Sequence, residues 1–304
     1  MATRSDSNSS RAPVAKTYKI FIGGKFPRTE SGRYYQFTGH FSGQPETGSF
    51  SANICSSSRK DFRNAVVAAR KAQSSWGAAN AYLRGQILYR IAEILEGRRE
   101  QFISELIHQG ASSKSAGVEV DTSIDRLVYY AGWSDKYQQV FSTVNPVSSS
   151  HFNFSVLEPS GVIAILSPDP IAGQYGLLTL VSNIAPAIVG GNTCVILADE
   201  SQPLTAISFA EVLQASDVPG GVVNILTGNK AELVDFFASH KDVNSLIHCE
   251  TDKLKCKRIQ ELGSENLKRI IHRANAKWDD ESQENPYLIK DTQEVKTTWH
   301  PIGG

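Results

Sequence analysis

The four cysteines are the residues of this sequence best suited to nucleophilic, redox or metal chemistry: Cys55, Cys194, Cys249 and Cys256. Four thiols so scattered in a chain of 304 residues do not indicate a disulfide scaffold, so we expect them to be reduced. His248 stands directly before Cys249, but a Cys-x6-Cys spacing with one adjacent histidine matches no known zinc pattern. We interpret these residues as a strand end and a helix face, and predict no metal site. No role is assigned to the isolated histidines His151, His240 and His272.

Charge and length exclude several classes of protein. The chain has 31 Lys and Arg against 31 Asp and Glu, so its formal net charge is zero and gives no electrostatic basis for binding nucleic acid or an anionic membrane. No apolar run approaches the roughly 18 residues that a transmembrane helix needs. The sequence therefore indicates a soluble cytoplasmic protein, with about two domains or one large α/β unit.

The elements in the first half are predicted from hydrophobic spacing. Residues 1–16 hold almost no large apolar side chain and are expected to be disordered. Gly23-Gly24 between apolar residues indicates a hairpin. Helical spacing of apolar residues predicts three amphipathic helices, around 62–69, 83–95 and 124–131.

The second half alternates short apolar strands with helices. We predict strands over 152–157, 162–166, 193–197, 222–227, 245–248 and 267–271, and helices over 177–189, 204–214 and 252–262. A further helix opens at Asn229, where Glu232 three residues later completes a capping-box pattern. Such alternation predicts βαβ units and a parallel sheet covered on both faces. Residues 287–302 are predicted to contain a terminal strand.

Several motifs, in this order and spacing, resemble the aldehyde dehydrogenase superfamily over residues 17–275. They lie at 21–26, 84–92, 129–136, 185–193 and 218–228. The segment SDVPGGVVNILTG (residues 216–228) and the short C-terminal tail are most similar to the truncated second domain of family 16 aldehyde dehydrogenases. The resemblance implies a Rossmann-type NAD-binding domain over 17–275. It also implies an antiparallel oligomerisation ribbon built from the early hairpins, residues 152–160 and a terminal strand. Residues 276–304 would contain a linker and this terminal strand.

The catalytic groups implied by the resemblance are missing. The family's Leu-Glu-Leu-Gly-Gly-Lys motif aligns with residues 272–277, which places Arg273 where the general-base glutamate should be, and arginine cannot accept a proton. The Gly-Gln-x-Cys nucleophile motif is absent, and the 304 − 277 = 27 residues that follow leave no room for a catalytic domain. The family's oxyanion asparagine corresponds to a turn over 167–174, where an alignment gap places Gln174 near that position and leaves its role open.

The cofactor site is also altered. In the family a Lys and a Glu hold the adenosine ribose, and they align with Leu197 and Glu200. A glycine-rich turn for the pyrophosphate aligns with residues 250–255, so Glu250 and Lys255 replace glycines. We expect the affinity for NAD to be lower by roughly two to four orders of magnitude, because one hydrogen bond is lost and the new side chains repel and block the pyrophosphate. The residual cofactor-binding positions are Ser167, Pro168, Glu200 and Gly228, with Leu197, Glu250 and Lys255 at lost positions.

Three functional hypotheses remain. The first is an inactive pseudoenzyme that works in assembly, as a homo-oligomer or bound to a complete aldehyde dehydrogenase domain, because an exposed sheet edge favours pairing with another chain. The second is an NAD-dependent oxidoreductase acting on aldehydes, or an NAD sensor. The third is that the chain is one part of a longer two-domain polypeptide.

Overall fold

A parallel sheet of five strands organises the protein. The computed structural model describes residues 16–39, 50–168, 175–274 and 276–303, so the predicted disorder of 1–15 lies outside the described residues. The order of the strands across the sheet is β10-β9-β6-β7-β8. Their bounds are Val162–Leu166 for β6, Thr193–Leu197 for β7, Val223–Leu226 for β8, Ser245–His248 for β9 and Arg269–His272 for β10. Every pairing is parallel, which confirms the predicted βαβ architecture.

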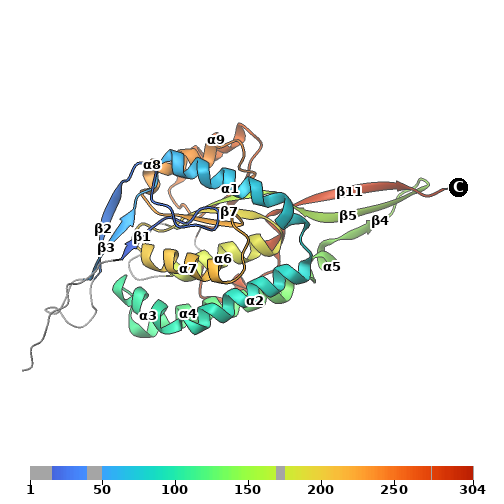
Figure 1. Ribbon diagram of the computed structural model, residues 1–304. Helices are drawn as coiled ribbons and strands as arrows, with labels where there is room; N and C mark the ends of the chain where they lie inside the picture. The colour runs from blue at the N-terminus through green and yellow to red at the C-terminus, as the bar shows by residue number, and fades with distance from the viewer. Residues whose placement is uncertain (1–15, 40–49, 169–174, 275, 304) are drawn as a thin grey trace, which may run out of the picture.

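Helices cover both faces of this sheet (Figure 1). α1 (Arg59–Ala78), α8 (Lys230–Ser239) and α9 (Lys253–Ser264) lie on one face, and α6 (Gly176–Val189) and α7 (Pro203–Ala215) lie on the other. A second layer packs against α6 and α7; it consists of α2 (Ala81–Gly97), α3 (Arg99–His108) and α4 (Ser113–Trp133). The strands are therefore buried on both sides, as their uninterrupted apolar runs predict.

Local signals in the sequence explain most of these elements. The side chain of Asn229 accepts a hydrogen bond from the Glu232 amide at 3.2 Å and caps α8 as expected. The predicted turn at Gly23 and Gly24 is present, since Ile22 and Lys25 exchange two backbone hydrogen bonds, but it joins single bridges rather than two full strands. α3 was missed by the spacing rule, because only three of its ten residues are buried.

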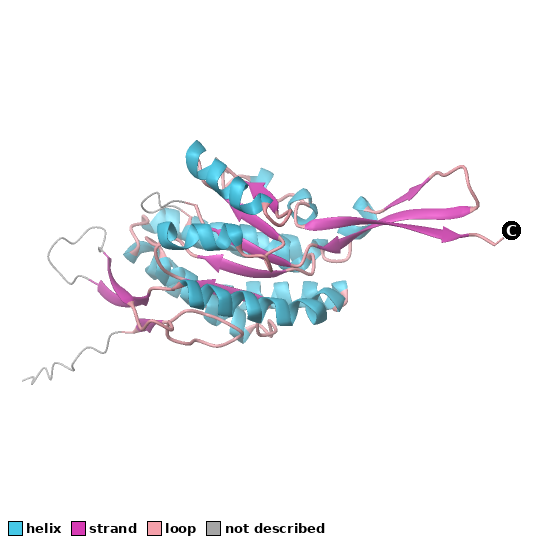
Figure 2. Cartoon of the chain, turned by 90° about the horizontal axis from the view of Figure 1, so that it is seen from above, coloured by secondary structure: helices cyan, strands magenta, loops and turns pink. Residues whose placement is uncertain are grey.

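Two smaller sheets flank the central one. β2 (Tyr34–Gly39) pairs antiparallel with β3 (Phe50–Cys55), which also pairs with β1 (Thr17–Tyr18). β5 (His151–Pro159) lies between β4 (Thr143–Asn145) and β11 (Gln293–Pro301), and these three strands form an arm that extends from the body (Figures 1 and 2).

This arrangement corrects two expectations. The early strands form a sheet of their own and take no part in the arm, because β3 pairs with β1 and β2. The terminal segment begins with a short helix, α10 (Tyr287–Lys290), and only then becomes β11. The remaining short helices are α5 (Tyr137–Phe141) and the 3-10 turn η1 (Glu281–Gln283). No helix in the described ranges has the length and apolar character needed to cross a bilayer.

Candidate functional site

A cavity of about 490 Å³ opens between α8 and α9, beside the carboxyl ends of the parallel strands. Its walls include Glu200, Asn229, Val234, Glu250 and Lys255. Open α/β sheets bind their ligands at this edge, because strand ends and helix N-termini meet there. Three residues that the sequence analysis placed in the cofactor site therefore line one cavity: Glu200 at a retained position, and Glu250 and Lys255 at lost positions.

Of the two positions that the resemblance assigns to the adenosine ribose, one keeps a polar group. Leu197 ends β7 fully buried and offers only an aliphatic side chain. Glu200 is exposed, and its carboxylate accepts a hydrogen bond from the Asn229 side-chain amide at 3.3 Å. The Tyr35 hydroxyl donates to the Glu200 backbone carbonyl at 3.2 Å. One acceptor for a ribose hydroxyl is thus present, and its neighbours hold it in place.

The other three retained positions are Ser167, Pro168 and Gly228. The Ser167 amide donates to the Leu197 carbonyl at 3.1 Å, and the Ser167 carbonyl accepts from the Lys230 ammonium at 3.0 Å. Pro168 follows, half-buried, and residues 169–174, which include Gln174, lie outside the described part of the chain. Gly228 has a φ of +142°, and a Cβ there would lie 2.9 Å from the Ser57 amide nitrogen. Glycine at 228 therefore permits the close approach of the segment before α1.

The turn that would receive a pyrophosphate is occupied by the protein's own carboxylates. One oxygen of the buried Glu250 carboxylate accepts hydrogen bonds from the amides of Thr251 and Asp252, both at 3.0 Å. The Asp252 carboxylate caps α9 by accepting from the amides of Leu254 and Lys255, at 2.7 and 3.2 Å. These are the donors that an anion at a helix N-terminus would use. The Lys255 ammonium lies 3.5 Å from Glu250, so its charge is directed to that carboxylate.

Arg273 follows β10 and is almost fully buried. Its Nη1 donates to the Asn183 side-chain oxygen at 2.8 Å, and its backbone amide donates to the His248 carbonyl at 2.9 Å. Burial lowers its pKa, yet arginine stays protonated in proteins. A guanidinium therefore lies where the resemblance would place a proton acceptor.

The thiols are not activated for nucleophilic attack. Cys194 lies inside the sheet, and burial raises its pKa strongly. Cys249 packs with Leu178 and Trp278. Cys256 is half-buried, and its pKa is raised by burial and then by the carboxylates of Glu250 and Asp252. A nucleophilic cysteine needs the opposite surroundings, with positive charge nearby.

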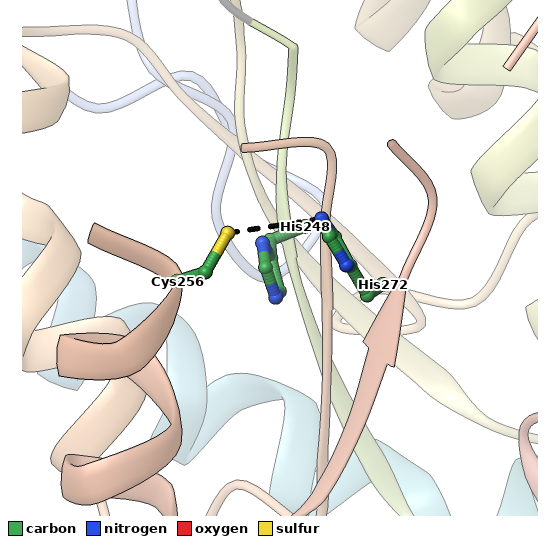
Figure 3. A group of neighbouring side chains, drawn as sticks. All are labelled: His248, Cys256 and His272. Carbon is green, nitrogen blue, oxygen red and sulfur yellow. Dashed lines mark hydrogen bonds between the residues drawn. The ribbon is translucent and has the colours of Figure 1, made fainter. Parts of the chain in front are cut away.

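Three side chains that the sequence left unassigned come together at the end of the sheet (Figure 3). His248, Cys256 and His272 each offer one ligand atom, and these atoms lie within 4.8 Å of one another. Spacing along the chain could not reveal the group, because His272 reaches it through the pairing of β10 with β9. The only available signal was that two neighbouring parallel strands both end in histidine.

Comparison with known proteins places this site in a family. Residues 41–277, most of the chain, match the family described as "Aldehyde dehydrogenase family". The chain belongs to the aldehyde dehydrogenase family. It is 30% identical over 262 residues to human mitochondrial 10-formyltetrahydrofolate dehydrogenase, a match that covers 84% of this chain and 27% of that protein. It is 31% identical over 267 residues to omega-crystallin of Enteroctopus dofleini, covering 86% of this chain and 51% of the relative.

Solved structures agree with the fold. The crystal structure of PnpE from Pseudomonas sp. WBC-3 superposes with a TM-score of 0.76 at 26% identity, covering 85% of this chain and 51% of PnpE. An NAD+ complex of an aldehyde dehydrogenase from Bacillus cereus gives a TM-score of 0.77 at 24% identity, covering 86% of this chain and 52% of that enzyme. The chain thus spans between about a quarter and half of these proteins. The particular resemblance to family 16 stays a prediction.

Proposed function

We propose that this chain is a non-catalytic aldehyde dehydrogenase-like protein that works in assembly, through self-association or by binding a complete aldehyde dehydrogenase domain. The observation that carries the proposal is one uncovered apolar face on the arm formed by β4, β5 and β11. Such a protein keeps the family fold and binds other proteins through its surface, without the catalytic groups of the family's active site.

The apolar face consists of Val144, Phe152, Phe154 and Val156. Strand pairing sets Val144 opposite Phe154, and alternation along β5 puts Phe152, Phe154 and Val156 on the same side. The two phenylalanine rings lie 5.4 Å apart, and the exposed fractions of Val144 and Phe152 are 68% and 44%. Contiguous exposed apolar side chains on a sheet mark a surface that another protein covers.

The opposite face of the arm combines polar side chains near β4 with exposed Val295 and Trp299 on β11. The Asn145 side-chain amide donates to the Asn153 side-chain oxygen at 2.6 Å and to the Ser155 hydroxyl at 2.9 Å. The hydroxyls of Ser155 and Thr297 are 2.8 Å apart. Both faces of the arm therefore expose apolar side chains, and those of β4 and β5 form the contiguous group that supports the arm as the contact surface.

The altered chemistry supports the non-catalytic part of the proposal. Arg273 stands at the position of the family's base and cannot take up a proton. Glu250 and Asp252 already accept the amide hydrogens that a pyrophosphate would need. A pyrophosphate would first have to displace the two carboxylates from these amides and would then lie beside their negative charge. Both effects lower the affinity for NAD.

Sedimentation velocity tests the assembly role. We expect the purified chain to sediment as an oligomer, and the double variant Val144→Ser/Phe152→Ser to shift to a folded monomer, because both side chains are exposed. The matched control is Val67→Ser on α1, where the side chain is 59% exposed and far from the arm. If the wild-type chain is monomeric alone and in mixtures with a complete family member, the proposal is wrong.

The cavity beside Glu200 supports a second candidate, an NAD sensor or residual oxidoreductase. Its place at the strand ends is the usual one for a nucleotide. Thermal unfolding with added NAD or NADH distinguishes the two candidates, because a ligand at about 100 times its dissociation constant stabilises the native state by about 2.7 kcal/mol. No shift at millimolar cofactor is expected for the scaffold. A shift of a few degrees would favour the sensor, and aldehyde turnover would establish the oxidoreductase.

A further inference from the structure

His248, Cys256 and His272 come from three elements that meet at one edge of the sheet (Figure 3). His248 ends β9 and His272 ends β10, and the parallel register pairs these two residues directly. Their rings are stacked, with centroids 4.6 Å apart and an interplanar angle of 15°. Cys256 stands in the first turn of α9, with its sulfur 3.8 Å from the His272 Nε2. The backbone, rather than flexible side chains, brings the group together.

The buried imidazole of His248 has no partner in the described structure. The residue is 1% exposed, and neither ring nitrogen forms a hydrogen bond with any described group. A neutral imidazole carries one nitrogen lone pair that is free to bind a cation. A buried polar group without a partner destabilises the folded state by about 1–3 kcal/mol. A bound cation would remove that penalty.

The other two side chains direct their hydrogens at a single oxygen. The Glu250 carbonyl accepts from the His272 Nε2 at 2.7 Å and from the Cys256 thiol at 3.2 Å. Because a carbonyl can only accept, the His272 proton must be on Nε2 in this arrangement. One divalent ion between sulfur and nitrogen would take the place of both hydrogens. The buried Glu250 carboxylate of the same residue adds negative charge close to that position.

We propose that His248, Cys256 and His272 form a binding site for a divalent cation of the zinc class. Two imidazoles and one thiolate are ligands that Zn²⁺ prefers, and three protein ligands leave a fourth position for water. His272 is exposed and Cys256 is half-buried, so the ion can enter from solvent on that side. This inference goes beyond the proposed function, because it concerns the sheet edge and not the arm.

Loading the ion changes protons in a defined way. The Cys256 thiol loses its proton to solvent as the sulfur–metal bond forms. His272 binds through Nε2, so its proton moves to Nδ1 with no net release, and its hydrogen bond to Glu250 is lost. Neutral His248 needs only a rotation of its ring out of the stacked arrangement. No oxidant or reductant is required.

Cobalt titration of the full chain tests the site, since Co²⁺ reports its ligands by absorption. We expect one equivalent to bind, with a thiolate-to-cobalt charge-transfer band in the near ultraviolet that disappears when Zn²⁺ displaces the cobalt. Cys256→Ser should abolish the band, and His272→Gln should weaken Zn²⁺ binding by at least ten- to a hundredfold, the range already seen when groups supporting a metal ligand are removed. Cys249→Ala is the matched thiol control, because that side chain packs with Leu178 and Trp278.

Thermal unfolding keeps the test interpretable if a variant folds poorly. Zn²⁺ should raise the unfolding temperature of the wild-type chain and of Cys249→Ala, and should leave Cys256→Ser and His272→Gln unchanged. A wild-type chain without the charge-transfer band, or zinc binding that is equally tight in both ligand variants, would overturn the proposal. Sedimentation of the same variants should match the wild type, so failure here leaves the assembly role untouched.

Discussion

Glu119 gives the sharpest quantitative prediction, because its carboxylate is buried without a counter-charge. The side chain extends from α4, and one oxygen accepts hydrogen bonds from the amides of Leu177 and Leu178, at 2.8 and 3.1 Å, at the start of α6. The other oxygen has no partner within the described ranges. Burial raises the pKa of Glu119 from 4.5 to about 7, although the two amides act in the opposite direction.

The sign of the effect on stability follows from this shift. A raised pKa means that the folded state holds the proton more tightly than the unfolded state. The favourable contribution is therefore complete below pH 4.5 and is lost as the pH rises towards 7. The two pKa values differ by 7 − 4.5 = 2.5, and each pKa unit corresponds to 1.36 kcal/mol. The free energy of unfolding should therefore be about 3 kcal/mol lower above pH 7 than below pH 4.5.

Denaturant unfolding at several pH values between 5 and 8 measures this loss. Glu119→Gln keeps an oxygen for the two amides and removes the charge, so the variant should be more stable than the wild type at pH 8 and should lack that part of the decline. Glu96→Gln, an exposed substitution on α2, is the control and should follow the wild type. Parallel pH curves for the wild type and Glu119→Gln would refute the assignment.

Three further substitutions test the site and its scaffold. Gly228→Ala should lower the free energy of unfolding by about 1–3 kcal/mol in denaturant melts, because the new Cβ would clash with the Ser57 amide and alanine disfavours a φ of +142°. The control Gly97→Ala should change it by less than about 1 kcal/mol, because a Cβ there would have no atom within 4 Å. Asn192→Ala should lower it by about 2–4 kcal/mol in the same assay, since its side chain joins the Gly161 amide at 2.9 Å to the Thr292 carbonyl at 3.0 Å; an effect below 1 kcal/mol would contradict this role. Glu250→Gln removes a charge from the anion turn but keeps an acceptor, and should tighten NAD binding by roughly tenfold, or about 1.4 kcal/mol, in calorimetry; unchanged affinity would show that charge is not what limits binding.

The pattern of apolar residues along the chain was sufficient to predict most strands of the central sheet. Residues 162–166, 193–197 and 245–248 were predicted as strands with the bounds that the structure gives, because a strand buried on both faces must be apolar throughout. α3 was missed because most of its side chains are polar or partly exposed, which weakens the periodic signal. The prediction for the arm was correct for residues 152–160 and the terminal strand, but it included the early hairpins where the structure has β4. Which strands pair depends on contacts between distant segments and not on the strands themselves.

The class of the fold could be predicted from the amino-acid sequence, which also predicts that two groups of the family's site are replaced. Arg273 in place of a carboxylate and Glu250 in place of a glycine are substitutions that no packing can reverse, because the side chains have the wrong charge and proton affinity. Tertiary structure alone decided what the remaining groups do together. The register of β10 against β9 sets His272 beside His248, and the packing of α9 brings the Cys256 sulfur within 3.8 Å of the His272 Nε2. Residues 16 or more positions apart become neighbours only when the sheet closes, so their chemistry is a property of the fold.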